Sequence, residues 1–76
     1  APDLVIEIVS KSTSKRDYGI KMLKYRTAGV KEYWIVDPIK ETVMVFWFED
    51  ETQNELYSLY DEIEFHLFPG LRVKLG

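Results

Sequence analysis

The sequence predicts an α/β fold in which one principal helix packs on a mixed β-sheet. An aliphatic run over residues 3–9 is typical of a strand, and a helical pattern follows it from residue 15. Further segments rich in aromatic and β-branched residues come next, separated by polar turns. The order strand, helix, strand and then more strands favours a sheet with its helix on one face. Because the chain has 76 residues and no low-complexity tract, residues 1–76 are expected to form a single domain.

The first strand, predicted over residues 3–9, carries aliphatic side chains on both of its faces. This pattern is typical of a central strand that is covered on both sides. In the polar segment that follows, Ser14 is a helix-capping residue with an acid three positions later, so a helix is expected over residues 15–28. Gly29 is expected to stop it. Its apolar stripe is predicted to contain Ile20, Leu23 and Thr27, and a neighbouring stripe carries Asp17, Lys21, Tyr25 and Ala28.

The rest of the chain is predicted to be β-structure. Strands are expected at residues 32–37, 42–48, 55–60 and 71–75, with a short extended piece before the last. The helix joins the first two strands of the chain as a right-handed parallel crossover, and the later strands follow as an antiparallel meander. The aromatic residues that alternate along these strands are expected in the core rather than on a nucleobase platform. His66, the only histidine, is expected to be half-buried or at the surface.

The composition excludes several functional classes. The chain contains no cysteine, which rules out a disulfide framework and a thiolate metal site. No apolar run approaches the ~20 residues of a membrane-spanning helix, so no membrane partner and a cytoplasmic setting are expected. Residues 1–31 carry seven basic and three acidic side chains, against three basic and ten acidic in residues 32–76. The basic half indicates either a surface that faces a polyanion or a solvated helix face.

Glu7 interrupts the aliphatic run of the first strand. A carboxylate among aliphatic side chains loses hydration, and this is costly unless a partner compensates. Glu7 is therefore expected at an open strand end or facing a cation. Asp3 shares its face of the strand, but the two residues lie roughly 13 Å apart at ~3.3 Å per residue. Two ligands of one divalent ion lie much closer together, so Asp3 and Glu7 are not expected to bind the same ion directly.

Lys21 is the natural cationic partner. A crossover helix doubles back along its strand and can place a long side chain over Glu7. Asp17 lies four residues before Lys21, in the favourable order for an ion pair on one helix. An ammonium beside a metal-bound carboxylate can orient a water nucleophile or stabilise charge that develops on a phosphate. Spacing alone favours the simpler interpretation, an ion pair with Glu7 or Asp17 that holds the helix in place.

Several motifs together make the chain resemble a known bacterial family. The first strand reads P-D-L-(V/I)-x-E-(V/I)-x-S, the helix D-x-x-x-K-x-x-x-Y, and the next segment G-V-x-E-Y-W with a V-D-P end. A closing P-G-L strand is also present. This combination spans essentially the whole chain and resembles the Uma family of "putative restriction endonucleases" in the PD-(D/E)xK superfamily. The main matching positions are Pro2, Asp3, Leu4, Glu7, Ser10, Asp17, Lys21, Tyr25, Gly29, Val30, Glu32, Tyr33, Trp34, Asp37 and Pro38.

The resemblance implies a restriction-endonuclease-like fold and a DNA endonuclease that hydrolyses phosphodiester bonds with Mg²⁺ or Mn²⁺. It implies that Glu7 is catalytic and a metal ligand, and that Lys21 supplies the catalytic lysine, since Val9 occupies the usual lysine position. The first acid of the family lies on a preceding strand. The chain is therefore interpreted as the C-terminal part of such a domain, with a partial core that lacks the N-terminal strands, or as a degenerate short form of it. Supporting residues are expected among Asp3, Ser10, Asp17 and Tyr25, the alternatives being capping for Ser10 and helix packing for Tyr25.

A second function class stays open beside the endonuclease. Without an upstream acid, the chain would be a catalytically incomplete α/β module that acts in binding or self-association. Strand edges left exposed by missing strands favour a homo-oligomer. The two hypotheses differ in whether Glu7 and Lys21 approach one another around a pocket with a further acid near Glu7.

Overall fold

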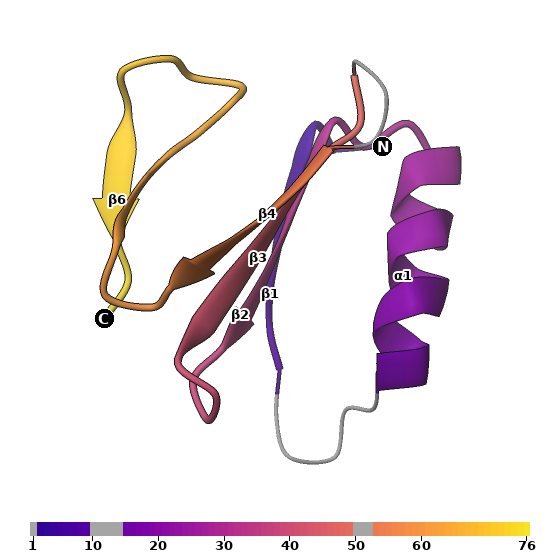
Figure 1. Cartoon of the computed structure of the whole chain (residues 1–76). Coiled ribbons are helices and arrows are strands. Elements are labelled where there is room, and N and C mark those ends of the chain that lie inside the picture. The colour runs from indigo at the N-terminus through magenta and orange to yellow at the C-terminus, as the bar shows by residue number, and fades with distance from the viewer. Residues whose placement is uncertain (1, 10–14, 50–52) are drawn as a thin grey trace.

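A four-stranded sheet forms the centre of the fold, with α1 on one side and a small hairpin on the other (Figure 1). The computed structural model describes residues 2–9, 15–49 and 53–76, and in residues 15–17 the backbone alone. The elements are β1 (Leu4–Ile8), α1 (Lys15–Thr27), β2 (Glu32–Asp37), β3 (Thr42–Trp47), β4 (Gln53–Ser58), β5 (Glu62–Glu64) and β6 (Arg72–Lys74). This arrangement confirms the predicted α/β fold with one helix on a mixed sheet.

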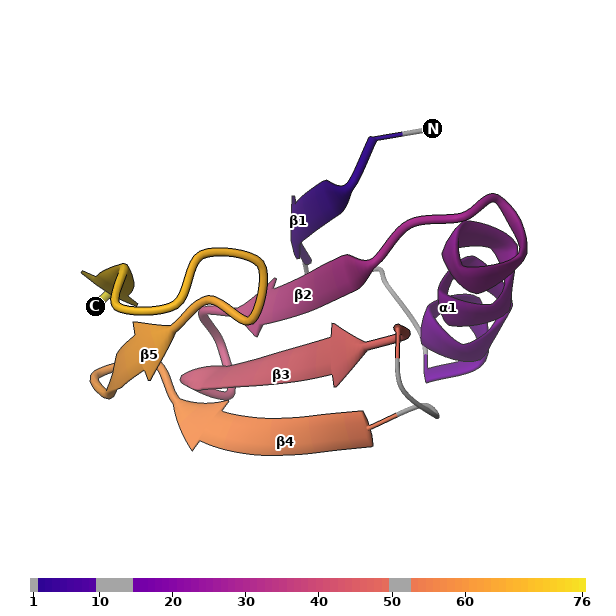
Figure 2. The ribbon, with the colours of Figure 1, turned by 90° about the horizontal axis from the view of Figure 1, so that it is seen from above.

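The sheet has the order β1-β2-β3-β4, and its strands lie side by side in Figure 2. β1 and β2 are parallel and are connected through α1, as the predicted crossover requires. β2, β3 and β4 are antiparallel neighbours. The predicted meander does not continue to the end of the chain, because within the described part β5 and β6 pair with each other in a separate two-stranded sheet.

Two hydrophobic clusters hold the layers together, one on each face of the central sheet. The cluster beneath the C-terminal hairpin contains Trp34, Val36, Val43, Val45 and Ile63. The cluster beneath α1 contains Val9, Tyr33 and Ile35, with Tyr18, Met22 and Tyr25 of the helix packed against it. β2 lies between both clusters, and its first five residues are buried. The aromatic residues of β2 are therefore core residues, as the sequence predicts.

The helix packs on the sheet through a different stripe from the predicted one. Ile20 and Leu23 are exposed, as is Thr27. The side chains that contact the sheet are Tyr18, Met22 and Tyr25, which recur at spacings of four and three residues. The helix turns this side to the sheet because Lys21 and Tyr25 on it reach Glu7 of β1. Polar and aromatic side chains, rather than aliphatic ones, therefore define the buried face of α1. The predicted stop is correct, since Gly29 has a φ of 92° and Val30 N donates to Tyr25 O.

β1 is the first strand of the sheet rather than a central one. Its outward side chains Ile6 and Ile8 are 42% and 75% exposed. The expectation of a strand covered on both sides is therefore wrong for the described residues. Aliphatic residues on both faces do not distinguish a central strand from an edge strand, because hydrogen-bond pairing leaves no mark on side-chain pattern.

β4 ends earlier than predicted, at Ser58 instead of Tyr60. The carboxylate of Asp61 accepts a hydrogen bond from Ser58 N at 2.9 Å, and Tyr60 N donates to Ser58 Oγ. These contacts form a turn that leads the chain to the other face of the sheet. Side chains that bond local backbone compete with strand pairing in this way.

Glu32 fastens the C-terminal segment to the sheet. Its side chain is fully buried, and its two oxygens accept hydrogen bonds from Trp34 Nε1 and from the backbone nitrogens of His66 and Leu67. The carboxylate thereby joins β2 to a loop more than thirty residues away in the chain. His66 itself is half-buried, as predicted, and its ring stacks on Trp47.

Candidate active site

Glu7 lies in the middle of β1 and points to the side of the sheet that carries α1. Its register partner is Ile35 of β2, a member of the cluster beneath the helix. Neighbours in register share a face of the sheet, so Glu7 lies in the layer between sheet and helix. Its side chain is 20% exposed, which leaves the carboxylate accessible at one side.

Three hydrogen-bond donors converge on this carboxylate. Lys21 Nζ lies 3.2 Å from Oε2, Tyr25 Oη lies 2.5 Å from Oε1, and Tyr33 Oη lies 3.2 Å from Oε2. Lys21 and Tyr25 come from α1 and Tyr33 comes from β2. The partner that the embedded acid was expected to need is therefore Lys21, assisted by two phenols. We call these four residues the Glu7 cluster.

Local structure explains why these side chains meet. Lys21 and Tyr25 are four residues apart on α1, so both project from one side of the helix toward β1. Tyr33 is the register partner of Val5, two residues before Glu7, and its side chain therefore lies diagonally next to the carboxylate. The rings of Tyr25 and Tyr33 pack with centroids 4.9 Å apart. This packing fixes the direction of both hydroxyl groups.

The surroundings adjust the pKa values in the cluster. Burial raises the pKa of Glu7, but the hydrogen bonds from Tyr25, Lys21 and Tyr33 outweigh it, so that the pKa lies below its ordinary value of 4.5. The hydrogen bond to Glu7 raises the pKa of Tyr25. Burial, together with the charge of Glu7, raises the pKa of Tyr33 well above its ordinary value of 10. At neutral pH the site therefore holds an ionised carboxylate and two protonated phenols.

The Glu7 cluster matches the needs of a divalent metal ion only in part. Magnesium prefers oxygen ligands and is commonly bound by one or two carboxylates together with water and substrate phosphate. Glu7 is the carboxylate of the cluster, and among the described residues no group of three histidine, cysteine or acidic side chains is placed to hold a metal. Lys21 and the two tyrosines contribute donors and no carboxylate. The cluster therefore fits one ligand of such an ion and does not by itself make a complete metal site.

The other predicted supporting residues are placed in different ways. Tyr25 belongs to the Glu7 cluster, and it both packs against the sheet and donates to the carboxylate. Asp3 lies before β1 with an exposed side chain, and its backbone oxygen accepts hydrogen bonds from Lys31 N and Glu32 N. Ser10 and the side chain of Asp17 lie outside the described residues. Of the two supporting residues whose side chains the structure describes, Tyr25 is the one that forms a hydrogen bond with Glu7.

Two residues with a clear place in the structure were missed. The sequence predicts that Tyr33 is a core aromatic residue, yet its hydroxyl donates a hydrogen bond to Glu7. Once β1 and β2 are paired in parallel with Val5 opposite Tyr33, strand alternation places Tyr33 on the face of the sheet that carries α1. Knowledge of this register would have identified Tyr33 as a neighbour of Glu7. Glu32 was not assigned a role, although it is a fully buried acid. A single acid at the start of a buried strand is a signal of an internal hydrogen-bonding partner.

Comparison with known proteins assigns the family. The model of the Uma2 family, described as "Putative restriction endonuclease", matches residues 1–76. The chain belongs to this family. A crystal structure of a "putative nuclease belonging to DUF820" from Anabaena variabilis superimposes with a TM-score of 0.77 at 25% sequence identity. The alignment covers 99% of the chain and 42% of the Anabaena nuclease, so the Uma2 chain spans less than half the length of that protein. No curated protein matches it.

The Uma2 chain therefore has the fold of a nuclease family, as its motifs predict. The positions that carry the family motif on β1 and α1 include Glu7, Lys21 and Tyr25, which meet in the Glu7 cluster. No helix within the described residues is long and apolar enough to cross a bilayer.

Proposed function

We propose that the Uma2 chain contributes the Glu7 cluster to the phosphodiester-cleaving site of a metal-dependent DNA endonuclease. The observation that supports this most directly is the accessible ammonium–carboxylate pair, in which Lys21 Nζ lies 3.2 Å from Glu7 Oε2. Membership of a family described as "Putative restriction endonuclease" supports DNA as the substrate. Glu7 and Lys21 are the proposed catalytic residues.

Hydrolysis of a phosphodiester forms a bond from a water oxygen to phosphorus and breaks the bond to one ester oxygen. The water loses a proton, the leaving oxygen gains one, and negative charge develops on the phosphate oxygens. Lys21 is 44% exposed at its side chain, so its ammonium can turn from Glu7 to a phosphate oxygen. Glu7 is ionised at neutral pH, which is the form that would hold a metal ion. Its lowered pKa makes it a weak base, so the proton that the water loses passes to the solvent.

Tyr25 and Tyr33 act as positioning residues. Their hydroxyl groups donate to Glu7, and because the pKa values of both phenols are raised, both donors persist through the neutral range. Two donors that approach from α1 and β2 hold the carboxylate in one orientation while Lys21 moves. A carboxylate fixed in this way loses less freedom when it takes part in the reaction.

A divalent metal ion is the proposed cofactor, as the family assignment supports. When bound, Mg²⁺ or Mn²⁺ supplies a Lewis acid that polarises the phosphate and lowers the pKa of a coordinated water. Glu7 is the residue of this chain that would serve as a ligand, and a further carboxylate is required from outside the described residues. Isothermal titration with Mn²⁺ tests this: Glu7→Gln should weaken binding by about tenfold or more. Equal affinities for the original protein and the variant would remove Glu7 from the metal site.

The catalytic role of Lys21 is tested by plasmid nicking in the presence of Mg²⁺ or Mn²⁺. Lys21→Ala should reduce the cleavage rate by about 10²-fold, as loss of a preorganised cation at a developing charge does. Lys24→Ala is the matched control, because Lys24 is exposed on the same helix and lies away from Glu7. Its cleavage rate should stay unchanged.

The same variants decide between catalysis and the simpler interpretation of an ion pair that holds α1 to β1. If the ion pair is only structural, Lys21→Ala lowers stability toward urea and cleaves as fast as the Lys24→Ala control. A loss of cleavage with an unchanged urea midpoint supports catalysis. Undiminished cleavage removes Lys21 from the mechanism.

We also propose that the Uma2 chain forms the C-terminal part of a larger nuclease domain. The 42% coverage of the Anabaena nuclease supports this interpretation. The exposed side chains of Ile6 and Ile8 on the first strand of the sheet support it as well, since a further layer would cover them.

A second candidate function is self-association without catalysis, and the same edge of the sheet favours it. Among the described residues, no strand pairs with the outer edge of β1. This edge lies next to two exposed isoleucines, so it is a surface for pairing with another strand. Size-exclusion chromatography with light scattering tests this. A homo-oligomer that Ile8→Lys converts to a monomer supports self-association, and a monomer at all concentrations contradicts it.

A further inference from the structure

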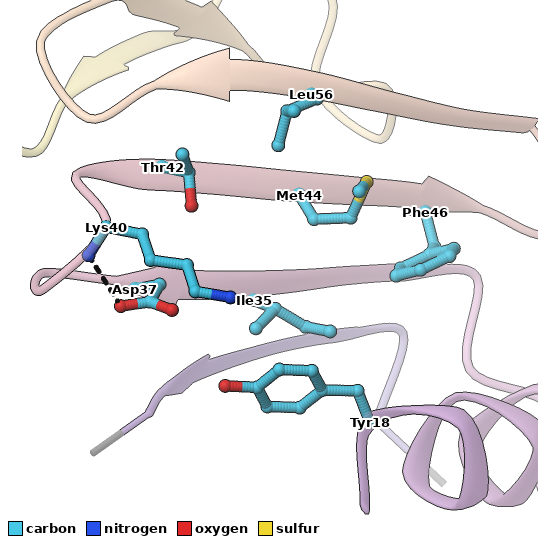
Figure 3. Close-up of a pocket in the computed structure, with 8 residues that line it drawn as sticks. All are labelled: Tyr18, Ile35, Asp37, Lys40, Thr42, Met44, Phe46 and Leu56. Atoms are coloured by element: carbon cyan, nitrogen blue, oxygen red, sulfur yellow. Dashed lines mark hydrogen bonds between the residues drawn. The ribbon is translucent and has the colours of Figure 1, made fainter. Parts of the chain in front are cut away.

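A second concave site lies beside the Glu7 cluster, on the same face of the sheet. It is a groove of about 410 Å³ between the first part of α1 and the strands β2, β3 and β4. Its floor is apolar and consists of Ile35, Met44 and Leu56, one residue from each of the three strands (Figure 3). This volume falls within the ~300–1,000 Å³ that is usual for small-molecule sites.

Aromatic rings border the floor, and two charged groups lie at one end. Tyr18 of α1 and Phe46 of β3 line the groove on either side of Ile35 in the close-up view. Asp37 lies at the end of β2, and its Oδ1 accepts hydrogen bonds from the backbone nitrogens of Ile39 and Lys40. The side chain of Lys40 runs from this turn back over the groove (Figure 3). The groove therefore combines an apolar floor with the carboxylate of Asp37, the ammonium of Lys40 and the hydroxyl of Thr42 at one end.

The register of the sheet connects the groove to the Glu7 cluster. Glu7 pairs with Ile35, Ile35 pairs with Met44, and Met44 pairs with Leu56, so that these side chains form one row across the sheet. Adjacent strands are about 4.8 Å apart, so the groove begins one strand away from the carboxylate. It also lies at the carboxyl ends of the parallel strands β1 and β2, where ligands of α/β sheets usually bind.

The floor of the groove is buried at Ile35 and open to solvent on the side of Leu56. Leu56 is 64% exposed although it is a large apolar side chain in the middle of a strand. Met44 and Phe46, its neighbours on β3, are only partly buried. Apolar surface of this kind next to a proposed catalytic site is expected to be covered when the substrate binds.

We propose that this groove binds a nucleobase of the nucleic-acid substrate, adjacent to the phosphodiester at the Glu7 cluster. A planar base matches a flat apolar floor bordered by aromatic rings, and its polar edge matches the acceptor of Asp37 and the donor of Lys40. A phosphate fits less well, because the floor offers it no donors and the carboxylate of Asp37 lies beside the ammonium of Lys40. The identity of the ligand rests on the proposed nuclease function, whereas the site itself rests on the groove and its position.

Methyl NMR spectroscopy tests the proposal without requiring cleavage. Protein labelled at the methyl groups of isoleucine, leucine and methionine is titrated with deoxynucleoside 5′-monophosphates, and in parallel with deoxyribose 5-phosphate. We expect the mononucleotides to shift the methyl signals of Ile35, Met44 and Leu56. Deoxyribose 5-phosphate, which lacks the base, should leave these signals in place.

A variant pair on the protein side isolates the groove. Leu56→Glu places a charge on the floor and should weaken mononucleotide binding by about tenfold, as expected from the loss of stacking area under a base. Leu71→Glu is the matched control, because Leu71 is also exposed but lies in the C-terminal segment. It should bind mononucleotides as the original protein does.

The outcomes separate this proposal from the proposed function. If mononucleotides shift the floor methyl signals, deoxyribose 5-phosphate does not, and the protein never nicks DNA, the nucleobase site is supported. Only the proposed nuclease function is then contradicted. Equal shifts with deoxyribose 5-phosphate, or mononucleotide shifts that avoid the three floor methyls, overturn the nucleobase site even if the protein nicks DNA. Unchanged affinity in Leu56→Glu overturns it as well.

Discussion

Replacing Glu32 with glutamine should destabilise the Uma2 fold, because the side chain of Glu32 links β2 to the C-terminal segment. The carboxylate of Glu32 is fully buried. Its Oε2 accepts hydrogen bonds from Trp34 Nε1 at 2.9 Å and from His66 N at 3.0 Å, and its Oε1 accepts one from Leu67 N at 3.0 Å. Glu32→Gln keeps the shape of the side chain and one acceptor oxygen. The second oxygen becomes an NH₂ group that faces a donor.

The magnitude follows from counting these bonds. With the amide oxygen at the Oε2 position, two bonds persist without their charge, and Leu67 N loses its acceptor. An unsatisfied buried donor costs about 1–3 kcal/mol, and a bond to a neutral acceptor is weaker by about 1 kcal/mol than one to a charged acceptor. The lower desolvation cost of the neutral amide offsets part of this sum. We expect a loss of about 2–4 kcal/mol, against roughly 4–11 kcal/mol for the stability of a chain of this length.

Urea unfolding followed by tryptophan fluorescence measures the change in the free energy of unfolding. Glu62→Gln is the matched control, because Glu62 is exposed in the same C-terminal hairpin, and it should change stability by less than about 0.5 kcal/mol. Amide hydrogen exchange adds a local test, since His66 and Leu67 should lose protection in Glu32→Gln. A variant that matches the control in stability and keeps both amides protected would refute the assigned role of Glu32.

Three further predictions concern the Glu7 cluster and the helix. Tyr33→Phe removes one donor from Glu7, so a carboxyl NMR titration should find a higher pKa for Glu7; an unchanged pKa would contradict the hydrogen bond at 3.2 Å. Because the folded-state pKa of Glu7 lies below 4.5, its ionised form stabilises the fold above that value, and this contribution is lost as the pH falls through the folded pKa. Stability measured in urea should therefore fall less steeply in acid for Glu7→Gln than for the original protein, and parallel acid profiles would count against it. Gly29→Ala should lower the free energy of unfolding by about 1 kcal/mol, because the φ of Gly29 is 92°. Gly19→Ala should raise it by about 0.5–1 kcal/mol, because a Cβ at Gly19 meets open space within the helix. Equal effects of the two substitutions in urea unfolding would contradict the assigned helix end.

Much of the fold could be predicted because local signals and short-range patterns agree. Residues 32–37 were predicted with the bounds that β2 has, since a buried strand between a glycine stop and Pro38 leaves little freedom. The parallel crossover followed from the order of elements and its fixed handedness. The wrong helix stripe had a tertiary cause. Ile20 and Leu23 have the spacing of a buried face, but nothing in the spacing says which of two neighbouring stripes meets the sheet.

The candidate site could be predicted in part, where the signal lies within one segment of the chain. Glu7 could be singled out because a charge within an aliphatic strand needs compensation, and Lys21 because a crossover helix returns over its strand. Tyr33 could not be assigned, since its contact with Glu7 depends on the parallel register of β1 and β2. Register is a property of two paired segments and leaves no signal in either one alone.

The sequence by itself determined the order of the elements, the family motif and the need of Glu7 for a cationic partner. These depend on residue type and on spacing within one segment. Only the tertiary structure decided which helix stripe faces the sheet, that β1 is its first strand, and that Tyr33 and Tyr25 complete the Glu7 cluster. The physical reason is that pairing and packing between distant segments are collective, so their outcome appears only when all segments compete for the same faces.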